Sequence, residues 1–194
     1  AHAADGEVPM RTYSVIVRGC LASGRLEQAA RYLSAMNDAG HEVPQPALVE
    51  FVSQSRRAHG DMRKVTEWFG DVFPLSLPAQ TFVHMIDECF ELATVETQVE
   101  SAALVEHLAL SQEVTLPLVA YEKLLRIYAR TNNSYGAECV RRMDAAGHRP
   151  CARACTNVMS RCADSQNVPL AESVAALLKS RSEMNLVAYK TFMK

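Results

Sequence analysis

The sequence feature that most constrains the fold is a periodicity of about 35 residues that runs along most of the chain. An aromatic or apolar position recurs with spacings of 35, 34, 39, 34 and 34 residues at Tyr13, Leu48, Phe82, Tyr121, Cys155 and Tyr189. A small apolar position recurs with spacings of 36, 37, 35 and 34 residues at Ala29, Val65, Ala102, Ala137 and Ala171. Such a repeat is typical of an array of similar units, each of which cannot bury its apolar face alone.

The first unit, within residues 11–40, predicts two short helices. One apolar stripe extends from Tyr13 to Cys20 at i, i+3, i+4 and i+7, and a second extends from Leu26 to Met36 with helical spacing. Gly24 and Gly40 follow the two stripes. Because glycine adopts a left-handed backbone without strain, we expect each glycine to end its helix.

The two ladders divide the chain into a short N-terminal extension and a repeat array. The extension covers residues 1–10 and the array 11–194, with units at about 11–44, 45–78, 79–117, 118–151 and 152–185 and a partial unit at 186–194. Helix pairs are expected at about 46–58 and 61–72, 79–92 and 98–111, and 151–163 and 168–181. The third unit is longer, and we place about four extra residues near Thr94 to Thr97 in the loop between its helices. The pattern predicts an all-α fold, a right-handed α-solenoid of stacked helix-turn-helix repeats with five pairs and part of a sixth.

The stretch between the second and third units predicts a connector within the array. Pro74 and Pro78 forbid a continuous helix there, and apolar residues lie beside them. Trp68 and Phe69 come one turn after Val65, so we expect both rings in the core of the second unit.

Composition narrows the class of protein. With 48% hydrophobic and 22% charged residues, a chain of 194 residues is typical of a folded protein. The net charge of −2 gives no global attraction to nucleic acid or to an anionic membrane. Six cysteines without a C-x-x-C pair favour a reducing compartment. No apolar stretch is long enough to span a membrane, so we expect no membrane insertion, and we expect any targeting segment to lie outside the given sequence.

The units resemble the pentatricopeptide repeat. The residues that carry the resemblance are Tyr13, Gly24 with Arg25, Ala29, Met36 and Gly40, echoed by Tyr121, Ala137, Met143, Gly147 and Pro150. The resemblance covers residues 10–194 and is strongest in the first and fourth units. The tetratricopeptide repeat is the competing pattern, but the leading tyrosine and the Met-x-x-x-Gly ending favour the pentatricopeptide repeat, while Pro150 fits either.

The resemblance implies a function and a set of residues. Proteins of this family are mostly organellar, in the mitochondrion or chloroplast, and mostly bind single-stranded RNA, with one base read per unit. Carried over to this chain, the first reading position falls on Ser14, Val49, Val83, Glu122 and Thr156, and the last on Pro44, Cys151 and Asn185. Thr156 with Asn185 is a base-reading pair that is known in this family, and the resemblance implies that it favours adenine. Val49 and Val83 offer no hydrogen bond, and Glu122 would repel adjacent phosphates.

The charge of the side chains on the same face gives a second test of whether the expected groove can bind RNA. The expected groove positions one and two turns further along are Arg18, Ala22, Ser53, Arg57, Asp87, Glu91, Arg126, Arg130, Ser160 and Asp164. With Glu122 included, these positions hold four basic and four acidic residues, so the lining has no net charge. RNA binding requires several unopposed cations, and Arg126 and Arg130 are the best candidates to hold phosphates.

Catalytic and metal chemistry find little support in the sequence. His148, Cys151, Cys155 and Cys162 could be drawn as a zinc site, but their helical spacing is that of buried small side chains. His84, Asp87 and Glu88 are more simply a solvated helix face, and so are the pairs Arg56-Arg57 and Arg141-Arg142. No phosphate-binding glycine loop or nucleophile motif is present in the sequence. We therefore predict a protein without catalytic activity or cofactor.

Two functions remain open. The first is binding of single-stranded RNA in organellar gene expression, carried by Thr156 with Asn185 and by Arg126 and Arg130. The second is a scaffold subunit of a large organellar assembly, such as a ribosome or a membrane complex, that has lost the base-reading residues. In that case Val49 and Val83 would cover a segment of a partner protein.

Overall fold

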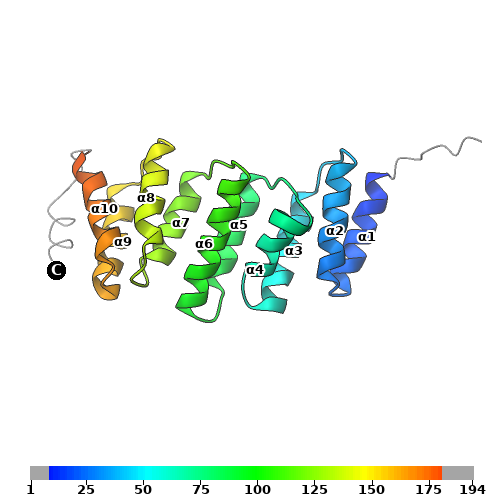
Figure 1. Ribbon diagram of the computed structural model, residues 1–194, viewed down its shortest axis with the longest axis horizontal. Coiled ribbons are helices and arrows are strands. Elements are labelled where there is room, and N and C mark those ends of the chain that lie inside the picture. Colours follow the sequence, from blue (N-terminus) through cyan, green and yellow to red (C-terminus); the bar gives the residue numbers. More distant parts are fainter. Residues whose placement is uncertain (1–8, 181–194) are drawn as a thin grey trace, which may run out of the picture.

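The computed structural model describes residues 9–180, and this part of the chain is helical without any β-strand (Figure 1). The helices are α1 (Met10–Ala22), α2 (Leu26–Asp38), α3 (Gln45–His59), α4 (Arg63–Glu67), the π-helical turn η1 (Trp68–Val72), α5 (Ala79–Phe90), α6 (Val95–Ser111), α7 (Leu118–Tyr128), α8 (Tyr135–Ala145), α9 (Ala152–Ser165) and α10 (Val168–Ser180). The expected helix pairs are confirmed to within about two or three residues at each end, a little beyond the usual uncertainty of helix ends.

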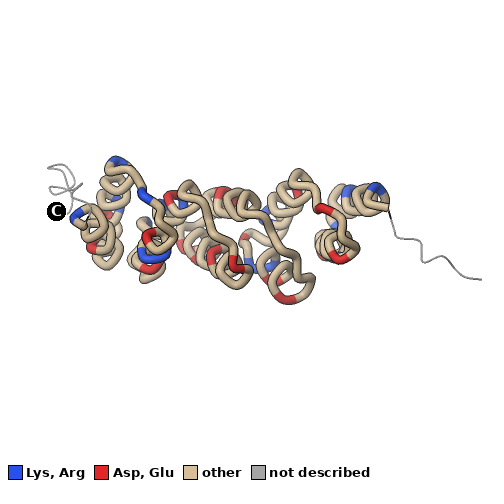
Figure 2. Tube along the Cα trace, turned by 90° about the horizontal axis from the view of Figure 1, so that it is seen from above, with Lys and Arg blue, Asp and Glu red and all other residues tan. Residues whose placement is uncertain are grey.

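The helices stand side by side in chain order in an elongated row (Figure 1). Each odd-numbered helix packs against the even-numbered helix that follows it and against the next odd-numbered helix. We call α1, α3, α5, α7 and α9 the first-helix layer, and α2, α4 with η1, α6, α8 and α10 the second-helix layer. Figure 2 shows the row turned by 90°.

The two ladders of the sequence lie in or at the edge of the core. Leu48 and Phe82 are almost fully buried, as are Ala29, Val65 and Ala102. Gly24 and Gly40 have φ of +67° and +77°, so both adopt the left-handed backbone expected after a helix. The helical units therefore pack through the positions that define the repeat.

The second unit differs from the others because its second helix is interrupted. After α4 the chain forms the π-helical turn η1, in which Trp68 and Phe69 are buried, as expected, and pack against Phe51 with ring centroids 5.8 and 5.0 Å away. The connector that follows is held by Gln112, the residue directly after α6. Its side-chain amide donates to the Leu75 carbonyl at 2.8 Å, and its Oε1 accepts from the Leu77 amide at 2.9 Å.

The expectation of a longer loop in the third unit is wrong. Thr94 caps α6, because its hydroxyl accepts a hydrogen bond from the Thr97 amide at 3.1 Å. The helix therefore begins at Val95, and the extra residues lengthen α6 to 17 residues instead of extending the loop.

Some predicted features lie outside the described residues. These are Asn185, Tyr189, the partial unit 186–194 and most of the extension 1–10. Within residues 9–180, no helix combines the length and apolarity required to cross a bilayer.

Candidate nucleic-acid interface

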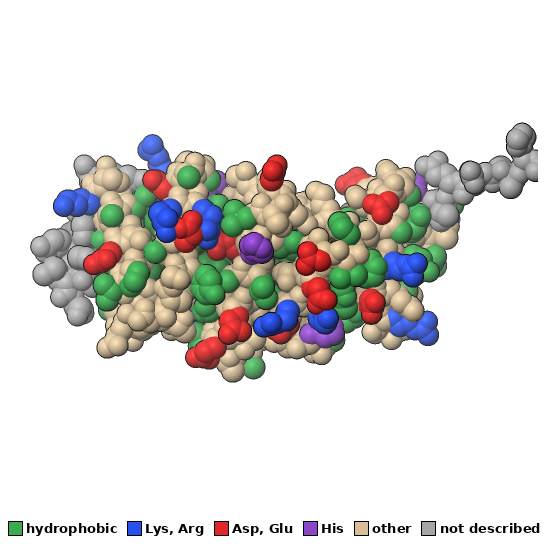
Figure 3. Space-filling view, viewed as in Figure 1, with side chains coloured by type: hydrophobic (Ala, Val, Ile, Leu, Met, Phe, Trp, Pro, Cys, Tyr) green, Lys and Arg blue, Asp and Glu red, His purple; other side chains and the backbone are tan. Residues whose placement is uncertain are grey.

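The two layers differ in charge. The helices of the first-helix layer contain eight Lys or Arg and five Asp or Glu, whereas those of the second-helix layer contain six Lys or Arg and ten Asp or Glu. Acidic, basic and hydrophobic side chains are all scattered over the face of the second-helix layer (Figure 3). The first-helix layer is therefore the face with the better electrostatic fit to a polyanion.

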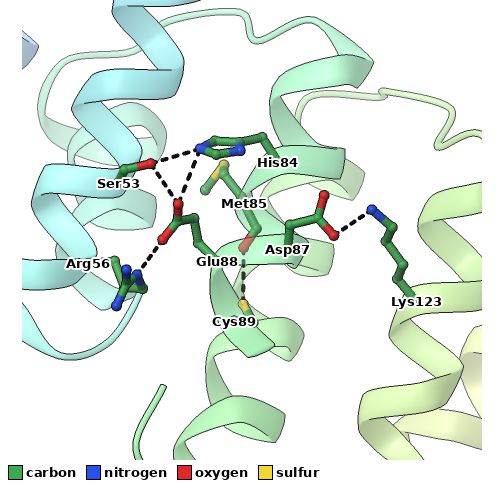
Figure 4. Close-up of polar contacts among 8 residues, drawn as sticks. All are labelled: Ser53, Arg56, His84, Met85, Asp87, Glu88, Cys89 and Lys123. Atoms are coloured by element: carbon green, nitrogen blue, oxygen red, sulfur yellow. Dashed lines mark hydrogen bonds and ion pairs between the residues drawn. The ribbon is translucent and has the colours of Figure 1, made fainter. Parts of the chain in front are cut away.

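In the middle of that layer, polar side chains join α3 to α5 (Figure 4). The Ser53 hydroxyl donates to Glu88 Oε1 at 2.6 Å and lies 3.0 Å from His84 Nε2. Arg56 donates from Nε to the other oxygen of Glu88, and His84 Nε2 lies 3.5 Å from Glu88 Oε1. We call Ser53, Arg56, His84 and Glu88 the Glu88 cluster.

The Glu88 cluster corrects two expectations. His84 and Glu88 do not form a solvated face, and Arg56 is not a solvated basic residue, because their side chains are only 23%, 12% and 18% exposed. Burial by itself raises the pKa of Glu88, but the hydrogen bonds from Ser53 and Arg56 and the nearby positive charge outweigh it, so the pKa lies below its ordinary value. The carboxylate thus stays ionised and satisfied within the protein.

The next junction, between α5 and α7, is closed in a similar way. Lys123 forms an ion pair with Asp87, and the Arg126 guanidinium lies 5.4 Å from the centre of the Phe90 ring (Figure 4 shows the first pair). Arg130 follows α7 and donates to the side chain of Gln98 in α6. Asp87 and Arg130, two expected groove positions, are therefore already engaged by neighbouring side chains.

The junction between α7 and α9 is open. A groove of about 710 Å³ lies between these helices, and we call it the α7–α9 groove. Its polar lining includes Glu122, Arg126, Asn157, Ser160, Arg161 and Asp164, and its apolar lining includes Val119, Leu125, Met143, Val158, Val174 and Leu177. Glu122, Arg126, Ser160 and Asp164 are positions that the sequence assigned to a groove, and here the structure brings them together.

Four polar side chains of this groove have no hydrogen-bond or ion-pair partner in the described part of the chain. Across residues 9–180, the side chains of Glu122, Asn157, Arg161 and Asp164 make no hydrogen bond or ion pair. Beneath the groove, α8 and α10 pack so closely that a Cβ on Gly136 would lie 2.7 Å from Leu170 Cδ2. The polar lining of the hollow comes from α7 and α9, whereas α8 and α10 contribute the apolar residues Met143, Val174 and Leu177.

At the other end of the layer a smaller hollow of about 260 Å³ lies between α1 and α3. Ser14 and Arg18 line it, as expected for groove positions. Both are partly engaged by their own helix, since Ser14 Oγ donates to the Met10 carbonyl at 3.1 Å and Arg18 Nε to the Ser14 carbonyl at 3.4 Å. Arg57 is exposed near the end of α3.

The remaining predicted reading positions differ in exposure. Val49 is half-buried, but Val83 is only 5% exposed, so the expectation that Val83 offers apolar surface to a partner is wrong. It faces the core because α5 is packed between α3 and α7. The Thr156 hydroxyl donates to the Ala152 carbonyl at 2.9 Å, and its expected partner Asn185 lies outside the described residues.

A second polar cluster is centred on Glu106 of α6 and was not predicted from the sequence. The Glu106 carboxylate is almost fully buried and accepts from the Tyr128 hydroxyl at 2.8 Å and from Arg142 Nε at 3.1 Å. Arg142 also pairs with Glu138 at 3.1 Å, so the expectation of a solvated Arg141-Arg142 pair is wrong for Arg142. A signal was present, since Glu106 interrupts an apolar stripe that includes Ala102, Val105 and Ala109.

Two of the three cysteines that the sequence predicted to be buried are buried, and the prediction is wrong for Cys151. Cys155 and Cys162 are buried and Cys151 is exposed, and burial raises the pKa of the Cys162 thiol to about 12. Cys89 is likewise buried, and its pKa is raised for the same reason. Among residues 9–180, no three His, Cys, Asp or Glu side chains are grouped so as to hold a metal ion.

No protein-family model matches the sequence, and no curated protein matches it. The function therefore has to be inferred from the geometry of the first-helix layer and from the pattern of the repeat.

Proposed function

We propose that this chain is a right-handed α-solenoid of the pentatricopeptide type that binds single-stranded RNA along its first-helix layer, without catalytic chemistry. The resemblance of the repeat implies that this activity serves gene expression in the mitochondrion or chloroplast. The regular alternation of helices and the burial of the ladder positions support the solenoid.

The observation that carries the proposal is the α7–α9 groove. Arg126, Arg161 and Asn157 line a hollow of about 710 Å³, and neither Arg161 nor Asn157 has a side-chain partner among residues 9–180. Polar groups of this kind are available to a ligand without breaking contacts inside the protein. Guanidinium groups form paired hydrogen bonds with phosphate and also lie flat on bases.

The rest of the layer supplies further cations. In the helices of the first-helix layer, the six basic side chains without a carboxylate partner among the described residues are Arg11, Arg18, Arg57, Arg126, Arg153 and Arg161. In the same helices, only three carboxylates have no basic partner among the described residues, namely Glu50, Glu122 and Asp164. The unpaired surplus of arginine favours a polyanion over a neutral ligand.

The test measures binding of fluorescent single-stranded RNA by the full chain at low and moderate salt. In the variant Arg126→Glu, Arg161→Glu we expect affinity at low salt to fall by at least about tenfold, because the change removes phosphate contacts and adds repulsion. The matched control, Arg31→Glu, Lys179→Glu, makes the same charge change on exposed side chains of the second-helix layer and should leave affinity nearly unchanged. Equal loss in both variants would contradict a site in the groove.

A second candidate function is supported by a different property of the same groove. Its rim carries Glu122 and Asp164 as well as Arg126 and Arg161, and its floor is apolar. A neutral rim over an apolar floor also fits a segment of a partner protein, as in the scaffold of a large organellar assembly. If RNA fails to bind even at low salt, this candidate replaces the first.

A further inference from the structure

One face of α7 presents three different chemical groups to the α7–α9 groove. Val119, Glu122 and Arg126 follow each other at i, i+3 and i+7, so they lie in line, about one turn apart, along the helix. Val119 is 45% exposed, which is unusual for an apolar side chain in a helix that is otherwise well packed. The face thus carries an apolar platform, a carboxylate and a guanidinium in a row.

The carboxylate in the middle of that row requires donors. Glu122 is half-buried, lines the groove with Leu125 and Val158, and makes no hydrogen bond or ion pair within residues 9–180. An ionised carboxylate only accepts hydrogen bonds, and its two oxygens match two donors that lie side by side. The apolar neighbours lower the local dielectric, so a ligand with such a pair of donors gains more here than in water.

Among the four RNA bases, only guanine presents two adjacent donors on its Watson–Crick edge, the N1–H and the N2 amino group. Adenine and cytosine each place a ring-nitrogen acceptor beside their amino group, and uracil places a carbonyl oxygen on both sides of its N3–H. These acceptors would face the lone pairs of the carboxylate. Bases in single-stranded RNA are commonly recognised through this edge.

We propose that the α7–α9 groove selects guanine, with the Glu122 carboxylate accepting from N1–H and the N2 amino group, Val119 lying against the base ring and Arg126 binding the neighbouring phosphate. This inference rests on the proposed RNA-binding function. It reverses the role expected for Glu122 from sequence, because Arg126 one turn away on α7 and Arg161 on α9 offset its repulsion of the backbone.

The experiment compares the affinities of the full chain for short oligouridines that carry one central guanine, adenine, cytosine or inosine. We expect guanine to bind about tenfold more tightly than adenine, the scale of discrimination of a paired hydrogen bond to a base. Inosine keeps N1–H but lacks the N2 amino group, so its affinity should fall between the two.

Two variants decide whether Glu122 is responsible. Glu122→Gln presents one acceptor and one donor, a pair that the Watson–Crick edge of every base can match, so the preference for guanine should be lost. Asp164→Asn makes the same change of charge in the same groove and should keep the preference for guanine. Both side chains lack partners among residues 9–180, and equal thermal melting of the three proteins checks that folding is unaffected.

The outcomes separate the inference from the function on which it rests. Equal affinity for all four RNAs would overturn the guanine inference and leave RNA binding intact. A guanine preference that survives in Glu122→Gln would assign the selection to another group and would also overturn the inference. Absence of binding to every RNA at low salt would overturn both.

Discussion

The Glu88 cluster and the α7–α9 groove are built from similar residues, yet one is closed and the other is open. In the cluster, the Glu88 carboxylate is in contact with Ser53, Arg56 and His84. In the groove, Glu122 occupies the equivalent layer and has no such partner among residues 9–180. The side chains of the cluster therefore stabilise the fold, whereas those of the groove are available to a ligand.

The difference follows from the net charge of each helix in the first-helix layer. Counting Lys and Arg against Asp and Glu gives +2 for α1, +1 for α3, −2 for α5, +1 for α7 and +1 for α9. Both junctions of α5 join helices of opposite sign and are crossed by ion pairs from Arg56 and Lys123. The α1–α3 and α7–α9 junctions join helices of like sign, and these two junctions contain hollows. Charge alternation between neighbouring helices thus predicts which junctions are closed.

The largest expected effect comes from removing a carboxylate from each region. Glu88→Ala should lower the free energy of unfolding by about 2–3 kcal/mol, because it leaves Arg56 and Ser53 partly buried without their acceptor. Glu122→Ala should change it by less than about 0.5 kcal/mol, as is usual for a side chain without partners. Urea denaturation of the three proteins measures both values. Similar losses in the two variants would remove the distinction between the regions.

A second prediction tests the close packing beneath the groove. Gly136→Ala should destabilise the protein by about 1 kcal/mol, because the new Cβ would overlap Leu170 between α8 and α10, and the gain in helix propensity offsets only part of that overlap. Gly19→Ala is the matched control. It lies within α1 and would meet no atom within 4 Å, so it should stabilise by about 0.5–1 kcal/mol. Thermal melting of both variants would show shifts of opposite sign, and a stabilised Gly136→Ala would contradict the tight contact.

The third prediction uses the pH dependence of the Glu88 cluster. Because the folded-state pKa of Glu88 is below its ordinary value of 4.5, its contribution to stability is complete above that value and is lost as the pH falls through the folded-state pKa. The stability advantage of the wild type over Glu88→Gln should therefore be constant near neutral pH and shrink in acid below about pH 4.5. Ser53→Ala removes one of the hydrogen bonds that lower the pKa of Glu88. This variant should therefore lose less stability than the wild type as the pH falls. Denaturation at a series of pH values checks both, and an advantage that persists unchanged in strong acid would exclude the mechanism.

The repeat pattern was sufficient to predict the helices, because ladder positions such as Leu48 and Phe82 define both the period and the core. It failed at Thr94 because a single capping hydroxyl decides where α6 begins, and helix periodicity does not report on caps. The repeat pattern also did not predict the π-helical turn at Trp68, because burial of two adjacent rings is compatible with either an α-helix or a π-helix.

The candidate site was predicted less completely than the fold. Spacing placed Glu122, Arg126, Ser160 and Asp164 on groove positions, and the structure brings these four together. Spacing did not show that Asp87 and Glu88 are engaged by Lys123 and Arg56, because those partners are more than 30 residues away along the chain. The charges of the helices indicate these ion pairs, because α5 is the helix of the first-helix layer that contains acidic residues and no Lys or Arg.

The smallest effect distinguishes a paired cation from an unpaired one within the same groove. Lys123 and Arg161 both line the groove, but Lys123 is bound to Asp87, whereas Arg161 has no carboxylate partner among residues 9–180. If Arg161 binds a phosphate, Arg161→Gln should reduce the slope of log affinity against log salt by about 0.7, the value for one phosphate of a single strand. Lys123→Gln removes the same charge and should leave the slope unchanged, because a cation already held by a carboxylate releases no counterion from RNA. Fluorescence titrations over a range of salt concentrations measure both slopes. Equal slopes in the two variants would mean that pairing inside the protein does not decide which cations bind RNA, and the contrast between closed and open junctions would then describe stability alone.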